Sequence, residues 1–342
     1  MKYLITGGCG FVGCNIAARL IAEGADVTVF DNLSRAGSEA NLAWLRTLGR
    51  VAFVSGDIRN REMVESLVGD LRPGVIFHLA GQVAMTTSMA DPRKDFEINV
   101  VGSINLLEAV RVYAPAAAVI YSSSNKAYGD LGQIRLEEKA KRYEAPDHPM
   151  GLDESTHLDF HTPYGCSKGA ADQYMLDYAR SFGLNTVVFR HSTIYGGRQF
   201  STYDQGWVGW FCRQAVETMT SPGRAPFTIS GDGKQVRDLL YVEDVVDCYL
   251  AAAKKISTAR GQAFNIGGGM ANSSSILELL DGLEARLRVK LSYTHLPWRH
   301  DDQRFFVANN TKAKSLLHWV PRVAKEDGVE RTIDWVKKNH GP

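Results

Sequence analysis

Residues 6–13 read TGGCGFVG and stand between a strand-like run, Tyr3–Thr6, and a helix-like segment, Phe11–Glu23. The glycines fit both the G-x-x-G-x-x-G and the G-x-G-x-x-G patterns, through Gly7, Gly8, Gly10 and Gly13. Such a turn brings backbone amides close to a pyrophosphate, and the helix N-terminus favours its negative charge. We therefore expect this turn to bind a dinucleotide rather than to serve only as a structural turn.

The same strand–turn–helix pattern repeats through the first half of the chain. Further strand-like runs are Asp26–Phe30, Val51–Ser55, Val75–His78, Ala118–Ser122 and Thr186–Arg190. Helix-like stretches between them include Met63–Leu71, Asp95–Tyr113 and Tyr164–Phe182. Alternation of this kind predicts an α/β fold with a doubly wound parallel (Rossmann) sheet, because parallel strands need crossover helices. The strands read as continuous apolar runs, which indicates that both faces of the sheet are buried.

The pattern loosens after Tyr195, where loops containing Gly, Pro and Trp separate a few helices such as Ser275–Leu287 and Lys325–Lys338. We expect a dinucleotide-binding domain at 1–194 and 236–264, with Arg237–Phe264 returning to the sheet. A smaller, discontinuous α+β substrate domain is expected at 195–235 and 265–342. The long insertion 130–162 precedes the helix-like segment that begins at Tyr164, and loops of that length are more often functional than idle.

Composition narrows the class of protein. The 342 residues carry 39 Lys and Arg against 38 Asp and Glu, a net charge of +1, which argues against nucleic acid as a partner. No apolar run approaches the ~20 residues of a membrane span, and MKYLITGG leaves no room for a signal peptide. The five scattered cysteines and the histidine spacing predict neither disulfides nor a metal site. We expect a cytoplasmic protein with no membrane partner.

Residues at the ends of the next strands complete the predicted cofactor site. Asp31 ends the second strand, where a carboxylate can bind the ribose hydroxyls and repel a 2′-phosphate, so NAD is favoured over NADP. Arg35 is a counter-argument, because it could pair with such a phosphate. Ligands of doubly wound sheets lie at the carboxyl ends of the strands, so we add the residues that follow the third and fourth strands: Asp57, Ile58, Leu79, Ala80 and Gly81.

A second constellation follows the fifth strand. YSSSNKAYG occupies 121–129, and Tyr164–Gly165–Cys166–Ser167–Lys168 gives Y-x-x-x-K, which puts Tyr and Lys on one helical face. With the glycine turn, these motifs make the chain similar to the extended short-chain dehydrogenase/reductases, the NAD-dependent epimerase/dehydratase family. The resemblance runs over essentially the whole length and includes INVVGSINLLEA around Asn99, FRHSTIYG at 189–196 and GDGKQVRDLLYVED at 231–244.

The resemblance implies roles for these residues. Tyr164 would take a proton from a sugar hydroxyl, Lys168 would hold the nicotinamide ribose, and Ser124 would orient the reacting oxygen. An ordinary tyrosine pKa near ~10 is too high for this, so we expect the Lys168 ammonium and the nicotinamide charge to lower it. The NAD contacts expected in full are Gly7, Gly10, Phe11, Val12, Gly13, Asp31, Asn32, Ser34, Arg35, Asp57, Ile58, Leu79, Ala80, Gly81, Gln82, Asn99, Ser122, Tyr164, Lys168 and His191.

The resemblance also implies a nucleoside diphosphate sugar as substrate. Arg237 and Arg299 stand where the family clamps the diphosphate, and the planar guanidinium suits phosphate oxygens. The expected substrate contacts are Val83, Thr87, Ser124, Asn125, Arg198, Gln199, Gln205, Arg237 and Arg299. Trp207 and Trp210 could stack on a base or sugar, but we interpret them as core residues. A homodimer or homotetramer is expected.

Three interpretations are open: a nucleotide-sugar epimerase, a 4,6-dehydratase or decarboxylase of the same family, and an NAD-binding sensor or structural protein without catalytic activity. Family dehydratases carry Asp-Glu after the catalytic Ser or Thr, whereas this chain has Asn125 and Lys126, so elimination is disfavoured. A non-catalytic NAD-binding protein is disfavoured because Ser124, Tyr164 and Lys168 are all present. Longer stretches, above all 153–191, resemble the branch of the family that inverts carbon 2 of CDP-linked 3,6-dideoxyhexoses. We therefore expect a CDP-sugar 2-epimerase, with a UDP-hexose 4-epimerase as the alternative.

Overall fold

A seven-stranded sheet forms the centre of the larger part of the molecule. The computed structural model describes residues 1–221 and 223–340. The strand order is β12-β8-β5-β4-β1-β2-β3, and all neighbours pair in parallel. The bounds are β1 Lys2–Thr6, β2 Asp26–Asp31, β3 Ala52–Ser55, β4 Val75–His78, β5 Ala118–Ser124, β8 Asn185–His191 and β12 Gln262–Ile266. The predicted doubly wound α/β fold is confirmed.

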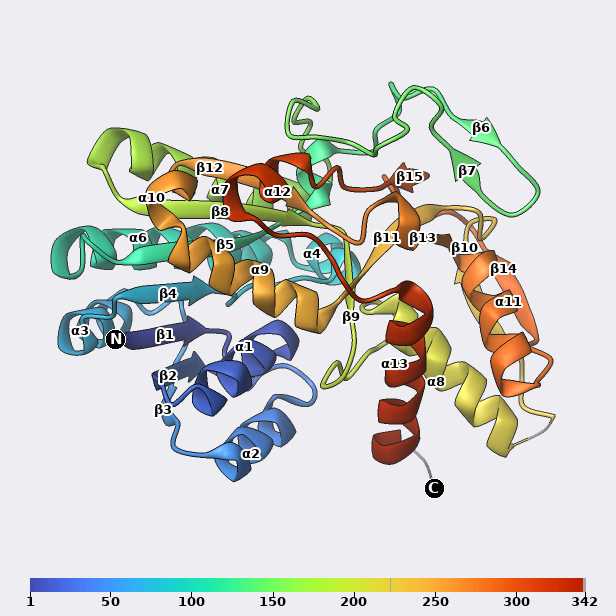
Figure 1. The fold of residues 1–342 in the computed structure, drawn as a ribbon, viewed down its shortest axis with the longest axis horizontal. Coiled ribbons are helices and arrows are strands. Elements are labelled where there is room, and N and C mark those ends of the chain that lie inside the picture. The colour runs from blue at the N-terminus through green and yellow to red at the C-terminus, as the bar shows by residue number, and fades with distance from the viewer. Residues whose placement is uncertain (222, 341–342) are drawn as a thin grey trace.

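Helices cover both faces of this sheet (Figure 1). Successive residues of one strand enter different cores: Leu4 packs with helices α3 (Arg61–Leu71), α6 (Gly102–Tyr113) and α7 (Thr162–Phe182). Ile5 packs with α1 (Phe11–Ala22), α2 (Ser38–Leu48), α9 (Val242–Lys254) and α12 (Thr311–Leu317). The period-2 alternation of strand side chains thus buries both faces. The carboxyl ends of the strands are left free for ligands.

The second region lies beyond those carboxyl ends. It contains a two-stranded sheet of β10 (Phe227–Ser230) and β14 (Tyr293–Leu296). A four-stranded sheet joins β9 (Thr193–Tyr195), β11 (Val236–Tyr241), β13 (Ser273–Ser275) and β15 (Phe305–Phe306). Helices α8 (Trp207–Thr220), α11 (Ile276–Leu287) and α13 (Lys325–His340) share a third hydrophobic core with β9, β10, β11 and β14. Segments from both sides of 236–264 therefore build one α+β region (Figure 1).

The expected return of Arg237–Phe264 to the large sheet was partly wrong. α9 packs on that sheet and β12 joins its edge, but β11 pairs with β9, β13 and β15. A short apolar run such as LLY at 239–241 suits either sheet, because periodicity does not reveal which partner a buried strand takes.

Three further expectations differ from the structure. The single helix predicted at Asp95–Tyr113 is divided into α5 (Pro92–Phe96), a π-helical turn η1 (Glu97–Val101) and α6. β3 is an edge strand whose Ala52 and Ser55 are exposed, so its faces are not both buried. Helix α2 was not predicted.

The remaining elements are α4 (Met85–Ala90), η2 (Asn125–Tyr128), β6 (Glu137–Glu138), β7 (Tyr143–Glu144), α10 (Ile256–Ala259) and η3 (Met270–Asn272).

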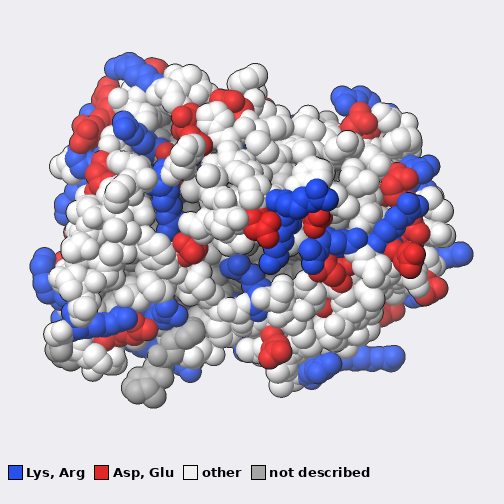
Figure 2. All heavy atoms as spheres, turned by 180° about the vertical axis from the view of Figure 1, so that it is seen from behind, with Lys and Arg blue, Asp and Glu red and all other residues white. Residues whose placement is uncertain are grey.

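Charged side chains of both signs are intermingled over the surface. Figure 2 shows Lys, Arg, Asp and Glu spread across one face and gathered around a hollow near its middle. No helix among the described residues is long and apolar enough to cross a membrane.

Candidate active site

The glycine turn is shaped so that side chains do not fit. Gly7 has φ +68°, and a Cβ there would lie 2.6 Å from Ala80 N; a Cβ on Gly13 would lie 2.3 Å from Gly7 O. Gly10 N donates to Gly7 O at 3.0 Å, and α1 begins directly after Gly10. The first turn of α1 therefore sits tight against β1 and β4, with its N-terminal end open to a pyrophosphate.

We expect Gly13→Ala to lose NAD affinity by at least about ten-fold and to lower the free energy of unfolding by about 1–3 kcal/mol, because the methyl group overpacks rigid backbone. Calorimetric NAD titration and denaturant unfolding measure the two effects. Gly282→Ala is the control, because nothing lies within 4 Å of a Cβ at this helical position. NAD binding by Gly13→Ala at the parent's affinity would contradict the assignment.

A cavity of about 230 Å³ opens at this turn. Asp31 lies in it, with Oδ2 accepting from Cys9 N at 3.0 Å and Oδ1 from Leu33 N at 2.8 Å, and burial raises the pKa of this carboxyl. Arg35 lines the same cavity. So do most expected NAD contacts, namely Gly7, Gly10, Phe11, Val12, Gly13, Asn32, Ser34, Asp57, Ile58, Leu79, Ala80, Gly81 and Ser122. This cradle fits a dinucleotide.

A larger cavity of about 370 Å³ adjoins the first. The two share lining residues: Phe11, Val12, Val83, Ser122, Gln199 and Gln205. The larger cavity adds side chains from the ends of β5 and β8 and from the start of α7, which are Ser124, His191, Tyr164 and Lys168. One cleft therefore places the cofactor cradle beside the expected catalytic residues.

Ser124 and Lys168 are buried, Tyr164 is partly buried, and all three form hydrogen bonds. Lys168 Nζ donates to Ser122 O at 2.6 Å, and Lys126 N donates to Ser124 Oγ at 3.1 Å. Burial raises the pKa of Tyr164 to about 12, although a hydrogen bond with Ser124 lowers it, and burial lowers the pKa of Lys168 to about 8. The expected lowering of the Tyr164 pKa by Lys168 is thus not seen in the protein alone. The reason is that desolvation of the phenolate outweighs the neighbouring groups.

Two expected cofactor residues, Gln82 and Asn99, form hydrogen bonds that join neighbouring segments. Gln82 N donates to Asn99 Oδ1 at 2.9 Å, and Asn99 Nδ2 donates to Ser167 Oγ at 2.9 Å. Neither Gln82 nor Asn99 lines either cavity. The π-helical turn η1 turns Asn99 inward, so that it ties the loop after β4 to α7 between Tyr164 and Lys168. π-helical turns are frequent at functional sites.

His191 is fixed in the neutral state. Its Nδ1 is 3.1 Å from Ser123 O and its Nε2 is 2.7 Å from Tyr249 Oη. Burial lowers the pKa of His191 to about 3, so the imidazole lining the cleft carries no charge near neutral pH.

The expected substrate residues mostly meet in the larger cavity. It is lined by Val83, Ser124, Asn125, Gln199, Gln205, Arg237 and Arg299. Arg198 instead lines the cofactor cavity, with its guanidinium 4.2 Å from the centre of the Trp44 ring. Thr87 is exposed and lines neither cavity, because Met85 two residues earlier takes the inward side of the short helix α4.

Several lining residues were missed. Trp207 and Trp210 pack against the third hydrophobic core, as expected, but they also line the larger cavity from the first turn of α8. Their spacing of three places both on one helical face, and that signal was available in the sequence. Tyr203, Ser230, Gln235, Lys126 and Asp302 also line the cavity. They come from loops and short strands whose sequence pattern gives no such signal.

Comparison with known proteins defines the class. The family model for the NAD dependent epimerase/dehydratase family matches residues 3–267. A CDP-paratose 2-epimerase of Salmonella typhi is 58% identical over 98% of this chain and 99% of its own length. A UDP-glucose 4-epimerase of Mycolicibacterium smegmatis is 30% identical over 98% of this chain and 99% of its own length. The UDP-glucose 4-epimerase of Thermus thermophilus, solved in complex with NAD, is similar with a TM-score of 0.82 and 28% identity, covering 99% of this chain and 100% of its own.

The chain belongs to the NAD dependent epimerase/dehydratase family. The expected family and the expected cofactor, NAD, are confirmed.

Proposed function

We propose that this protein is an NAD-dependent isomerase that inverts carbon 2 of a CDP-linked 3,6-dideoxyhexose through a transient 2-keto sugar. The observation that carries the proposal is the 58% identity with a CDP-paratose 2-epimerase across nearly the whole of both chains. The alternative, a UDP-hexose 4-epimerase, has less support, because a relative with that name is 30% identical over the same share.

The cleft residues can perform the proton transfers of such a reaction. NAD, when bound, accepts a hydride from the sugar carbon and returns it. In this proposal Tyr164 takes the hydroxyl proton, and its hydrogen bond with Ser124 supports the pairing of these two residues. Lys168 is buried and lines the same cavity, and we propose that its positive charge stabilises the phenolate once NAD is bound. Val83, Trp207 and Phe211 add apolar walls to the cavity.

The residues after Ser124 do not supply an acid–base pair for dehydration. Asn125 Nδ2 donates to Gln303 Oε1 at 2.7 Å, and Lys126 forms an ion pair with Asp302 at 3.3 Å. Neither is a carboxylate, so no general base for removing a proton from carbon stands at these positions.

Two arginines line the larger cavity and not the cofactor cavity. Arg237 Nη2 donates to Asp302 Oδ1 at 2.9 Å, and Arg299 Nη2 donates to Tyr203 O at 3.1 Å. Both line the larger cavity, so we propose that they bind the diphosphate. Arg299 lies in 265–342, which together with 195–235 we assign to the sugar nucleotide. We assign 1–194 and 236–264 to NAD, with the exception of Arg237, whose strand β11 belongs to the second region.

The double variant Arg237→Ala with Arg299→Ala is expected to raise KM for the CDP-sugar by about 10²-fold, because each charged hydrogen bond contributes about 1.5–3 kcal/mol. Steady-state kinetics checks this, with a smaller change in kcat. The control is Arg61→Ala with Arg180→Ala, whose side chains are 72% and 77% exposed. An unchanged KM in the first double variant would refute the clamp.

A substrate panel tests the proposed function itself. CDP-paratose, CDP-glucose and UDP-glucose are each incubated with the purified protein, and the sugar products are identified by NMR. We expect inversion at carbon 2 of CDP-paratose. Conversion of UDP-glucose at carbon 4 with none of CDP-paratose would establish the alternative. The expected homodimer or homotetramer is tested by size-exclusion chromatography with light scattering, which measures the molar mass of the protein in solution.

A further inference from the structure

A buried lysine stands beside the catalytic serine with no role in the chemistry above. Lys126 lies in η2, two residues after Ser124, and lines the larger cavity together with Tyr164. Its side chain is 16% exposed. Nζ donates to Asp301 O at 3.2 Å and to Asp302 Oδ1 at 3.3 Å. A strongly hydrated ammonium group is costly to bury, so this position requires an explanation.

Positive charge exceeds negative charge around Lys126. Asp302 Oδ1 also accepts from Arg237, whose side chain is 11% exposed, so two buried cations share one carboxylate oxygen. Burial lowers the pKa of Lys126, and the charge of Arg237 lowers it further. A group with this charge balance, facing a cavity, favours an anionic ligand.

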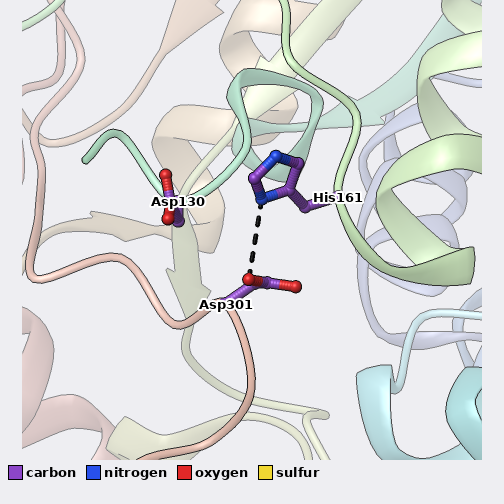
Figure 3. A group of neighbouring side chains, drawn as sticks. All are labelled: Asp130, His161 and Asp301. Carbon is purple, nitrogen blue, oxygen red and sulfur yellow. Dashed lines mark ion pairs between the residues drawn. The ribbon is translucent and has the colours of Figure 1, made fainter. Parts of the chain in front are cut away.

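The carboxylate of Asp301 also stabilises the charge of Lys126, but Arg299 is a third cation beside Lys126 and Arg237. The charges of all three lower the pKa of Asp302, so three cations face two carboxylates. Asp301 Oδ1 lies 3.6 Å from His161 Nδ1, at the N-terminal end of α7, and Asp301 also contacts His300. Figure 3 shows Asp301 and His161 facing one another with Asp130 nearby, from three separate segments. These contacts fix the loop that carries Asp302 against the start of the catalytic helix.

The covalent structure of the proposed substrate indicates which of its anionic groups binds beside Lys126. In a nucleoside diphosphate sugar, three bonds separate carbon 2 from the β-phosphorus, whereas five bonds separate carbon 4 from it. An enzyme that presents carbon 2 to Tyr164 therefore needs a cation for the β-phosphate closer to the catalytic hydroxyls than a 4-epimerase does. Lys126 is close to Ser124 in the chain, whereas Arg299 contacts Ser230 and Tyr203 in the second region.

We propose that Lys126 and Arg237 together bind the β-phosphate of the CDP-sugar, and that Lys126 thereby sets the register that presents carbon 2 rather than carbon 4. This inference rests on the proposed function, because it takes a diphosphate sugar as the ligand. It makes Lys126 a specificity residue, which binds the part of the substrate that does not react.

Binding of CDP and CMP to the NAD-loaded protein tests the phosphate contact without any turnover. We expect Lys126→Met to weaken CDP by about ten-fold or more, because a charged hydrogen bond is lost, and to change CMP by less than about two-fold. Lys126→Arg should keep most of the CDP affinity. Lys290→Met, at a side chain 90% exposed, is the control for removing a positive charge. Calorimetry measures all four proteins, and Lys126→Gln replaces the Met variant if that does not fold.

Each result decides the proposal. Loss of CDP affinity alone, recovered by arginine, supports a β-phosphate contact. Equal losses for CDP and CMP, or CDP affinity within two-fold of the parent, would overturn it. Kinetics with CDP-paratose tests whether Lys126 determines which carbon is presented to the catalytic residues. We expect Lys126→Met to raise KM about ten-fold or more and to yield some product inverted at carbon 4. A parent protein that does not convert CDP-paratose would instead refute the proposed function, while the CDP and CMP comparison would still stand.

Discussion

Turnover of the Tyr164→Phe variant is expected to fall by about 10²–10⁴-fold, because general acid–base transfer contributes rate factors of that size. Phenylalanine keeps the ring and removes the oxygen that would take the sugar hydroxyl proton. The loss should appear in kcat, with KM for the CDP-sugar and the NAD content near those of the parent. Stopped assays of the inverted product, together with NAD quantification, measure both.

Tyr174→Phe is the matched control for this result. It lies on the same helix α7, but its side chain is 46% exposed and lines neither cavity. It should leave kcat unchanged. Turnover of Tyr164→Phe within a few-fold of the parent would remove Tyr164 from the role of base.

The second large effect is on the stability of the fold, through a buried ion pair between α7 and β8. Asp172 on α7 is fully buried, and it accepts from Arg190 Nε at 2.8 Å, from Arg190 Nη2 at 2.9 Å and from Ser123 Oγ at 2.8 Å. Asp172→Ala leaves a buried guanidinium without its carboxylate. We expect the free energy of unfolding to fall by about 3–5 kcal/mol, measured by denaturant titration.

Two controls separate loss of the partner from loss of volume. Asp172→Leu combined with Arg190→Met removes both charges and should recover much of the stability, because no unpaired charge is left. Asp177→Ala breaks the exposed pair with Arg180 on the same helix and should leave the free energy of unfolding close to that of the parent. A loss below about 1 kcal/mol for Asp172→Ala would contradict the importance of this buried pair.

The sequence predicted the parallel sheet well, because its signals are local. The six strand-like runs each overlap an observed strand, and the glycine turn follows β1 as expected. A parallel strand that is buried on both sides reads as a short continuous apolar run, which can be recognised without knowing its partners. Ligands of such sheets bind at the carboxyl ends of the strands, so the residues that follow each strand could be predicted to line the cofactor cavity.

What the sequence did not predict depends on contacts between distant segments. The π-helical turn at 97–101 depends on Asn99 reaching Ser167, and β11 pairs with β9 rather than with the large sheet. Likewise, the environment of Lys126 is created by Asp302, 176 residues further along the chain. Such pairings are decided by tertiary packing, and a window of local sequence carries no information about them.

The fate of the hydrogen at carbon 2 tests the central claim most directly. CDP-paratose carrying deuterium at carbon 2 is converted in ordinary water, and the product is examined by NMR and mass spectrometry. Internal hydride return predicts inversion at carbon 2 with the deuterium retained there. Wash-out of the deuterium to solvent, or inversion at carbon 4 only, would contradict the account.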